Sequence, residues 1–235
     1  IINLAGYINH SNLSSDYNKI IREHFLAVKN IVRVVPKKSL KKFLQIGSSV
    51  EYGLAKAPQN EKTKLRPITT YALAKTKTTN YLKKIYKKEK YPFVIARLFL
   101  TYGPGQKNDR FIPQIITGCL KNQKFPTTSG EQVRDFCYIS DTVSAILLLL
   151  TNKKIVGDIF NVASGVPVKI KTVINLINKI IGKGKPEFNK RKLHAGENEK
   201  LYADIKKIKN QLNWRPKVTL VNGLKKTISY FKKNG

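Results

Sequence analysis

The chain contains 235 residues, of which 41% are hydrophobic, and its formal net charge is +31 at pH 7. This length allows one buried core with a small second lobe, and the ordinary apolar content excludes disorder as the default. The longest apolar stretch, residues 145–150, is far shorter than the ~18 residues of a membrane span. We therefore expect no membrane partner, and the beginning of the chain does not resemble a secretion signal.

A positive charge of this size is typical of proteins that bind nucleic acid. Here lysine far outnumbers arginine (37 against 8), and the lysines recur in pairs along the whole chain. This scatter favours solvated helix faces over one dedicated binding surface, so we do not expect nucleic acid as the partner. A polyanion-binding or nucleic-acid-binding protein, or a protein without catalytic activity, remains the alternative interpretation.

The two cysteines, Cys119 and Cys137, have neither metal-binding nor redox spacing. They predict a cytoplasmic protein with two inert thiols and without a metal site. The chain contains no methionine and begins with the apolar residues Ile1 and Ile2, as if a strand were already in progress. We therefore expect the true start of the protein to lie upstream.

The first half of the chain alternates between apolar strands and amphipathic helices. In chain order, the pattern predicts strands over 1–6, 43–47 and 93–99, with helices over 21–35 and 70–88. The strands are near-continuous apolar runs, which is typical of a parallel sheet with helices on both faces. We therefore predict an α/β fold built on a doubly wound, parallel, Rossmann-type sheet.

The second half of the chain has a looser pattern. It predicts one further strand over 159–163, and helices over 112–120, 143–150, 170–181 and 221–231. We interpret part of it as a small α/β lobe above the carboxyl ends of the strands, where such sheets bind ligands. The predicted division assigns residues 1–105 and 136–165 to the sheet domain, and residues 106–135 and 166–235 to the lobe.

A tyrosine and a lysine four residues apart, Tyr71 and Lys75, share one face of the helix predicted over 70–88. A neighbouring positive charge lowers the pKa of a phenol, which makes it available as a base near neutral pH. The spacing is not specific, because three other tyrosines are also followed by lysine at the fourth position. Tyr71 differs from them because its helix follows a strand that ends in Ser48 and Ser49.

Several motifs occur in the order found in one enzyme family: Gly47-Ser48-Ser49-Val50-Glu51-Tyr52-Gly53, Tyr71-x-x-x-Lys75, Arg97 to Gly105, Arg134-Asp135-Phe136-x-Tyr138, Phe160 to Gly165, and Leu212-Asn213-Trp214-Arg215-Pro216. The ordered set resembles the extended short-chain dehydrogenases/reductases, and in particular their NAD-dependent nucleotide-sugar epimerase/dehydratase branch. The resemblance covers essentially the whole chain.

The resemblance implies a catalytic group of three residues. Ser48, with Ser49 as its rival by one position, would hydrogen-bond the reacting sugar oxygen. Tyr71 would exchange a proton with the sugar hydroxyl, and Lys75 would bind the nicotinamide ribose and keep Tyr71 ionised. The cofactor would be NAD or NADP, beneath which the segment Leu4, Ala5 and Gly6 would run.

The resemblance also implies a nucleotide-diphosphate sugar as the substrate. Arg134 would bind the diphosphate, unless it forms a structural salt bridge with Asp135 or Asp141. The other expected substrate-binding residues depart from the family pattern or have a competing role in the core. Arg110 and His194 stand where the family has asparagine and arginine, and Phe111 and Phe125 would form either pocket walls or core.

Other departures narrow the expected reaction. The first strand–helix–strand unit of the family, its glycine-rich phosphate turn and the residue that selects NAD or NADP would lie upstream of Ile1. We therefore expect this stretch to be inactive by itself. Ser49-Val50 stands where dehydratases have an acidic pair, which leaves 4-epimerisation or 4-keto reduction, with hydride transfer at sugar C4. A homodimer could form through the helices over 17–35 and 70–88.

Overall fold

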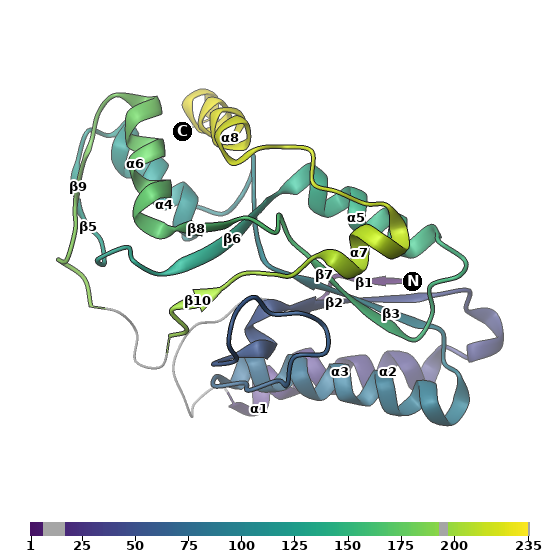
Figure 1. Cartoon of the computed structure of the whole chain (residues 1–235). Coiled ribbons are helices and arrows are strands. Elements are labelled where there is room, and N and C mark those ends of the chain that lie inside the picture. Colours follow the sequence, from purple (N-terminus) through teal and green to yellow (C-terminus); the bar gives the residue numbers. More distant parts are fainter. Residues whose placement is uncertain (7–16, 193–196, 235) are drawn as a thin grey trace.

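The computed structural model describes residues 1–6, 17–192 and 197–234 (Figure 1). Its main sheet has four parallel strands in the order β1-β2-β3-β7. They are β1 (Ile2–Asn3), β2 (Phe43–Ser48), β3 (Phe93–Leu98) and β7 (Asp158–Val162). The predicted strands of the first half are therefore present. β1 is shorter than predicted because the Asn3 side chain accepts a hydrogen bond from Ala5 N (3.1 Å), which turns the chain out of the sheet.

Helices cover both faces of this sheet, which confirms the predicted doubly wound fold (Figure 1). One face carries α1 (Tyr17–Ile21), α2 (Ala27–Val34) and α3 (Thr70–Glu89), and the other carries α5 (Ile139–Thr151) and α7 (Lys206–Leu212). The helix predicted over 21–35 is interrupted by a π-helical turn, Arg22–Leu26, and a short 3₁₀ turn, Lys37–Ser39, follows it.

The alternation of side chains along β3 explains why the sheet needs helices on both sides. Phe93 and Ile95 pack in one apolar cluster with Leu82 of α3. Val94 and Ala96, which point the other way, pack in a second cluster with residues of α5 and β7. All four β3 side chains are completely buried, as expected for a central strand of a parallel sheet.

The remaining elements form a lobe around a third apolar cluster, which contains Ile116, Ile174 and Leu224. Its helices are α4 (Phe111–Leu120), α6 (Ile170–Ile181) and α8 (Leu220–Asn234). Its strands are β4 (Leu100–Tyr102), β5 (Lys124–Pro126), β6 (Val133–Tyr138), β8 (Pro167–Lys169), β9 (Lys185–Glu187) and β10 (Lys200–Leu201). β6 pairs in parallel with β4 and β10 and antiparallel with β8, while β5 pairs with β9.

The predicted domain boundary at residue 136 falls inside β6. This strand pairs with the lobe strands, whereas α5, which follows it directly, packs on the main sheet. β6 was not among the predicted strands, and its polar residues Arg134 and Asp135 explain why no apolar run marks it. The division of the chain into two units therefore stays a prediction.

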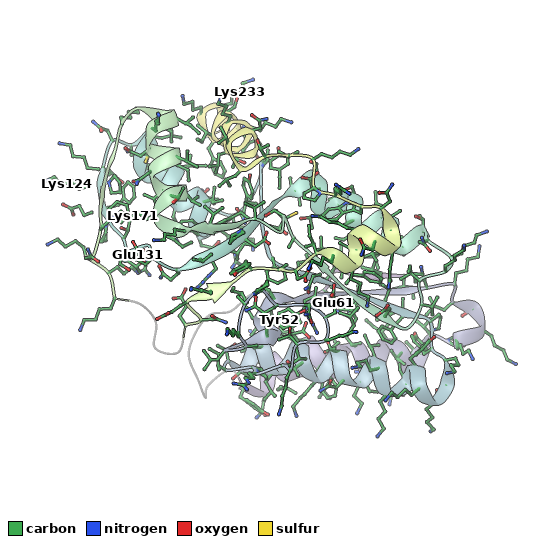
Figure 2. All side chains as sticks on the ribbon, in the orientation of Figure 1. Tyr52, Glu61, Lys124, Glu131, Lys171 and Lys233 are labelled. Atoms are coloured by element: carbon green, nitrogen blue, oxygen red, sulfur yellow. The ribbon has the colours of Figure 1, made fainter. Side chains whose placement is uncertain are left out.

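Exposed lysines lie around the periphery, as the scatter of lysines in the sequence predicted. Lys124 and Lys233 point outward at the rim of the lobe (Figure 2). In the part of the chain that the structure describes, no helix has the length and apolar character needed to cross a membrane.

Removing a core side chain of β7 tests this packing. Phe160 is completely buried in the cluster between the main sheet and α5. We expect Phe160→Ala to lower the free energy of unfolding by about 3–5 kcal/mol, because it removes apolar contacts and leaves a cavity. Val166→Ala, in the loop between β7 and β8, is the control, because Val166 is 57% exposed. Urea unfolding should show no resolvable change for the control, and equal midpoints for the two variants would contradict the assigned core.

Candidate active site

Ser48 lies at the carboxyl end of β2, where it caps the following 3₁₀ turn, η3 (Ser49–Tyr52). Its hydroxyl accepts a hydrogen bond from Val50 N, and its own backbone N–H donates to Oε1 of Glu51 (2.9 Å). Ser48 remains half-buried and interacts with the Tyr71 phenol, whereas Ser49 is buried. Of the two rival serines, Ser48 is therefore the one that faces Tyr71.

The start of α3 places Tyr71 and Lys75 beside Ser48. Thr69 caps the helix by accepting a hydrogen bond from Ala72 N (3.1 Å), so Tyr71 lies in the first turn and Lys75 one turn later. The Lys75 ammonium donates to the carbonyl of Ile46 on β2 (3.0 Å), and Nζ lies 5.7 Å from the centre of the Tyr71 ring. The structure thus brings the three predicted catalytic residues together at one edge of the sheet.

The expected lowering of the Tyr71 pKa is wrong for this structure. Burial raises the pKa of Tyr71, because the phenolate loses solvation, and the negative charge of Glu51 raises it further. The Ser48 hydroxyl and the positive charge of Arg110 act in the opposite direction. Burial also lowers the pKa of Lys75, although Glu51 opposes this shift. Burial and the Glu51 charge therefore outweigh the opposing effects of Ser48 and Arg110 on the Tyr71 pKa.

Glu51 is a completely buried carboxylate for which the sequence analysis gave no role. Its Oε2 accepts hydrogen bonds from Thr79 Oγ1 on α3 (2.7 Å) and from Nη2 of Arg97 on β3 (2.8 Å). The Arg97 guanidinium also lies 4.6 Å from the centre of the Tyr52 ring. Opposite charges within two adjacent apolar segments are the sequence signal that could have revealed this pair.

His24 lies in the π-helical turn and is likewise buried next to Tyr71. The two rings meet edge to face, with their centres 5.1 Å apart. The backbone carbonyl of His24 accepts a hydrogen bond from Thr78 Oγ1 of α3 (2.8 Å), which ties this turn to the helix that carries Tyr71. The sequence analysis did not single out His24, because it predicted a regular helix over 21–35. The π-helical turn that contains His24 has no signal in the spacing of apolar residues.

The segment expected to run beneath the cofactor leaves the sheet beside this turn. Leu4, Ala5 and Gly6 are all exposed. Gly6 has a φ of +129°, and a Cβ atom there would come within 2.6 Å of the His24 ring. A glycine is thus required at this position, because the backbone passes directly over His24.

On the lobe side, Arg134 is buried on β6 and forms an ion pair with Glu197. It does not pair with Asp135 or Asp141, the two partners weighed for it in the sequence. Asp135 accepts hydrogen bonds from backbone N–H groups of Ser164, Gly165 and Ala203, and Asp141 accepts one from Val218 N.

The other predicted substrate residues border the lobe core. Arg110 is half-buried at the amino end of α4, and its charge acts on Tyr71. Phe111 packs against Phe136, with ring centres 6.0 Å apart, and both Phe111 and Phe125 are half-buried against the lobe cluster. His194 lies outside the described residues, and within them no group of three or more His, Cys, Asp or Glu side chains could hold a metal.

The buried ion pair between Glu51 and Arg97 gives a direct test of this arrangement. Glu51→Gln leaves the Arg97 charge buried without its counterion, so we expect a loss of about 3–5 kcal/mol in the free energy of unfolding. Glu131→Gln is the matched control, because Glu131 pairs with Lys169 at the exposed surface. Denaturant unfolding should separate the two variants clearly. Equal stabilities would contradict the role of Glu51 as the counterion of Arg97.

Known proteins resemble this chain both in sequence and in fold. The model of the NAD dependent epimerase/dehydratase family matches residues 1–163. An uncharacterized UDP-glucose epimerase of Bacillus subtilis, YtcB, is 30% identical over 224 residues, which cover 94% of this chain and 70% of that protein. A UDP-glucuronate 4-epimerase of Thermodesulfobacterium geofontis is 27% identical, over 87% of this chain and 64% of that protein.

Among solved structures, the UDP-glucuronic acid 4-epimerase of Bacillus cereus, in complex with UDP-glucuronic acid and NAD, superposes with a TM-score of 0.90 at 26% identity. The match covers 99% of this chain and 74% of that one. In the comparison of sequences, the mouse dTDP-D-glucose 4,6-dehydratase is 28% identical, over 87% of this chain and 59% of that protein. The present chain belongs to the NAD-dependent epimerase/dehydratase family.

Proposed function

We propose that this chain supplies the acid–base and sugar-binding side of an enzyme that uses NAD or NADP to act on a nucleotide-diphosphate sugar. The reaction we propose is 4-epimerisation, or reduction of a 4-keto sugar. The observation that carries the proposal is the convergence of Ser48, Tyr71 and Lys75 at the carboxyl edge of β2. The membership of the chain in the family supports it.

The chemistry of these side chains fits proton exchange at one sugar oxygen. Tyr71 takes the proton from the sugar 4-hydroxyl or returns it, because its phenol lies in the first turn of α3 next to Ser48. The Ser48 hydroxyl hydrogen-bonds the same oxygen and orients it. Burial of Tyr71 excludes water, so that the proton passes between protein and sugar rather than to solvent.

The residues present fit the nicotinamide end of the cofactor. Lys75 uses one of its three N–H donors on the Ile46 carbonyl, which leaves donors for ribose hydroxyls. The backbone of Leu4, Ala5 and Gly6 is exposed, and we assign it to the surface beneath the cofactor. The chemistry that NAD or NADP supplies when bound is the exchange of a hydride with sugar C4.

On the substrate side we assign Arg134 to the diphosphate, because a planar guanidinium suits bidentate binding of phosphate oxygens. Arg110 and Phe111, at the start of α4, would contact the sugar and nucleotide, together with Phe125 and His194. The relatives include proteins named for UDP-glucose and UDP-glucuronic acid, so a uridine diphosphate sugar is the first substrate to test. Ser49-Val50 in place of an acidic pair disfavours dehydration.

If two copies of the chain associate, we propose the helices over 17–35 and 70–88 as the surface through which they do so. A cytoplasmic location is our further inference. It is supported by Cys119 and Cys137, which are both buried and unpaired with each other.

Replacing the proposed acid–base group tests the function. We expect Tyr71→Phe to abolish turnover in the full-length protein, because phenylalanine cannot exchange the proton, while nucleotide-sugar binding survives. The matched control is Tyr86→Phe, because Tyr86 is also followed by a lysine at the fourth position, and Lys90 Nζ lies 5.2 Å from its ring centre. The control should keep full turnover in an assay of the sugar product. Unchanged turnover of Tyr71→Phe would contradict the proposed role of Tyr71 as the acid–base group.

The diphosphate assignment has its own test. We expect Arg134→Gln to weaken binding of UDP by about 10-fold or more, because it removes a charge-assisted contact worth roughly 1.5–3 kcal/mol. Arg215→Gln, at an exposed arginine that follows α7, is the control and should bind UDP as the wild type does. Calorimetric titration gives both affinities. Equal weakening in the two variants would point to general charge attraction instead of a site at Arg134.

A further inference from the structure

We propose that Glu51 is a positioning residue of this active site: one buried carboxylate holds Ser48, the catalytic helix α3 and strand β3 in a fixed relation. The inference rests on the proposed function, because it concerns the placement of Ser48, Tyr71 and Lys75. Glu51 itself is completely buried, so we assign it a role that acts through its neighbours rather than through contact with the sugar or the cofactor.

Both carboxylate oxygens are used, and they reach three different elements. Oε1 accepts the backbone N–H of Ser48 at the end of β2 (2.9 Å). Oε2 accepts the Thr79 hydroxyl of α3 (2.7 Å) and Nη2 of Arg97 on β3 (2.8 Å). A shorter or differently shaped side chain could not span the three partners, so their relative positions depend on this one residue.

The catalytic helix is thereby anchored at two successive turns, first to β2 and then to the 3₁₀ turn η3 that follows β2. Lys75 donates to the Ile46 carbonyl, and Thr79, four residues later on the same helix face, donates to Glu51. Between these anchors lies Gly47, where a Cβ would come within 2.8 Å of Ile95 and 3.0 Å of Glu51 Oε1. The absence of a side chain at Gly47 lets the carboxylate lie directly beneath the strand that carries Ser48.

Glu51 is also a negative charge that acts on both titrating residues. It raises the pKa of Lys75, which favours the ammonium form, and it raises the pKa of Tyr71. The other groups around Tyr71 are Ser48 at the end of β2, Lys75 one turn later on α3, Arg110 at the N-cap of α4, and the His24 ring from the π-helical turn. A neutral side chain at position 51 should therefore move the Tyr71 titration to lower pH.

The first experiment measures that titration without turnover. The full-length protein is labelled with ¹³C at the phenolic carbon of tyrosine, and the Tyr71 signal is identified by its loss in Tyr71→Phe. We expect Glu51→Gln to lower the Tyr71 pKa, because it removes a nearby negative charge. Glu61→Gln is the matched control: Glu61 is a partly buried carboxylate that accepts Asn161 N (2.8 Å) and does not act on Tyr71. An equal shift in both variants would overturn the proposal.

The second experiment separates positioning from folding. Glu51→Gln alone leaves Arg97 unpaired, so the double variant Glu51→Gln with Arg97→Met is used as well, because it removes both buried charges. We expect the double variant to recover thermal stability while kcat stays about 10- to 100-fold below wild type and KM for the nucleotide sugar is unchanged. Thr79→Val, which removes one anchor and keeps the ion pair, should give a smaller loss of kcat.

The outcomes distinguish this inference from the proposed function. If Tyr71→Phe retained turnover, the proposed function would fail regardless of Glu51. If Tyr71→Phe is inactive but the double variant recovers wild-type kcat together with stability, Glu51 serves the fold alone, and only the positioning role is overturned.

Discussion

The last residues of strand β2 constrain the whole site. The carbonyl of Ile46 accepts the Lys75 ammonium, Gly47 leaves room for Glu51, and the backbone N–H of Ser48 donates to that carboxylate. Because β2 lies between β1 and β3 in a buried parallel sheet, its end cannot shift without disturbing the core. The position of the candidate catalytic groups is therefore set by the packing of the sheet rather than by a flexible loop.

The same region concentrates buried charge, which is costly unless it is paired. Arg97 lies between Glu51 and the Tyr52 ring, and burial raises the pKa of Tyr52 to about 12, so this phenol stays protonated. The Tyr52 hydroxyl donates to Asn161 Oδ1 (2.7 Å) on β7. Tyr52 and Glu61 lie near each other (Figure 2), and the charge of Glu61 acts on the Tyr52 phenol. These contacts connect the floor of the site to β7 and to the loop that contains Glu61.

Patterns of apolar residues were sufficient to predict the fold class. The strands β2, β3 and β7 are nearly continuous apolar runs, and the spacing of three and four residues marked α3, α4, α6 and α8. The same reasoning missed β6, because Arg134 and Asp135 interrupt any apolar run there. The π-helical turn around His24 was also missed, since it depends on contacts with Thr78 and Gly6 from other parts of the chain.

For the candidate site, chain order predicted which residues would meet but not how their environment would act on them. Tyr71 was selected from four similar pairs because of its place after Ser48, and the structure puts these residues side by side. The direction of the Tyr71 pKa was wrong, because the degree of burial depends on packing that spacing does not reveal. Glu51 stood within a recognised motif, yet its partners Thr79 and Arg97 are 28 and 46 positions away.

Under the proposed function, a hydride moves at sugar C4 while Tyr71 exchanges the proton on the attached oxygen. The most direct measurement follows a UDP-sugar labelled with deuterium at C4 in the presence of the full-length protein and NAD or NADP. If the hydride moves at C4, we expect the deuterated sugar to react more slowly than the unlabelled one. We expect the deuterium to be kept on C4 or passed to the nicotinamide. Equal rates, with the deuterium lost to water, would contradict it.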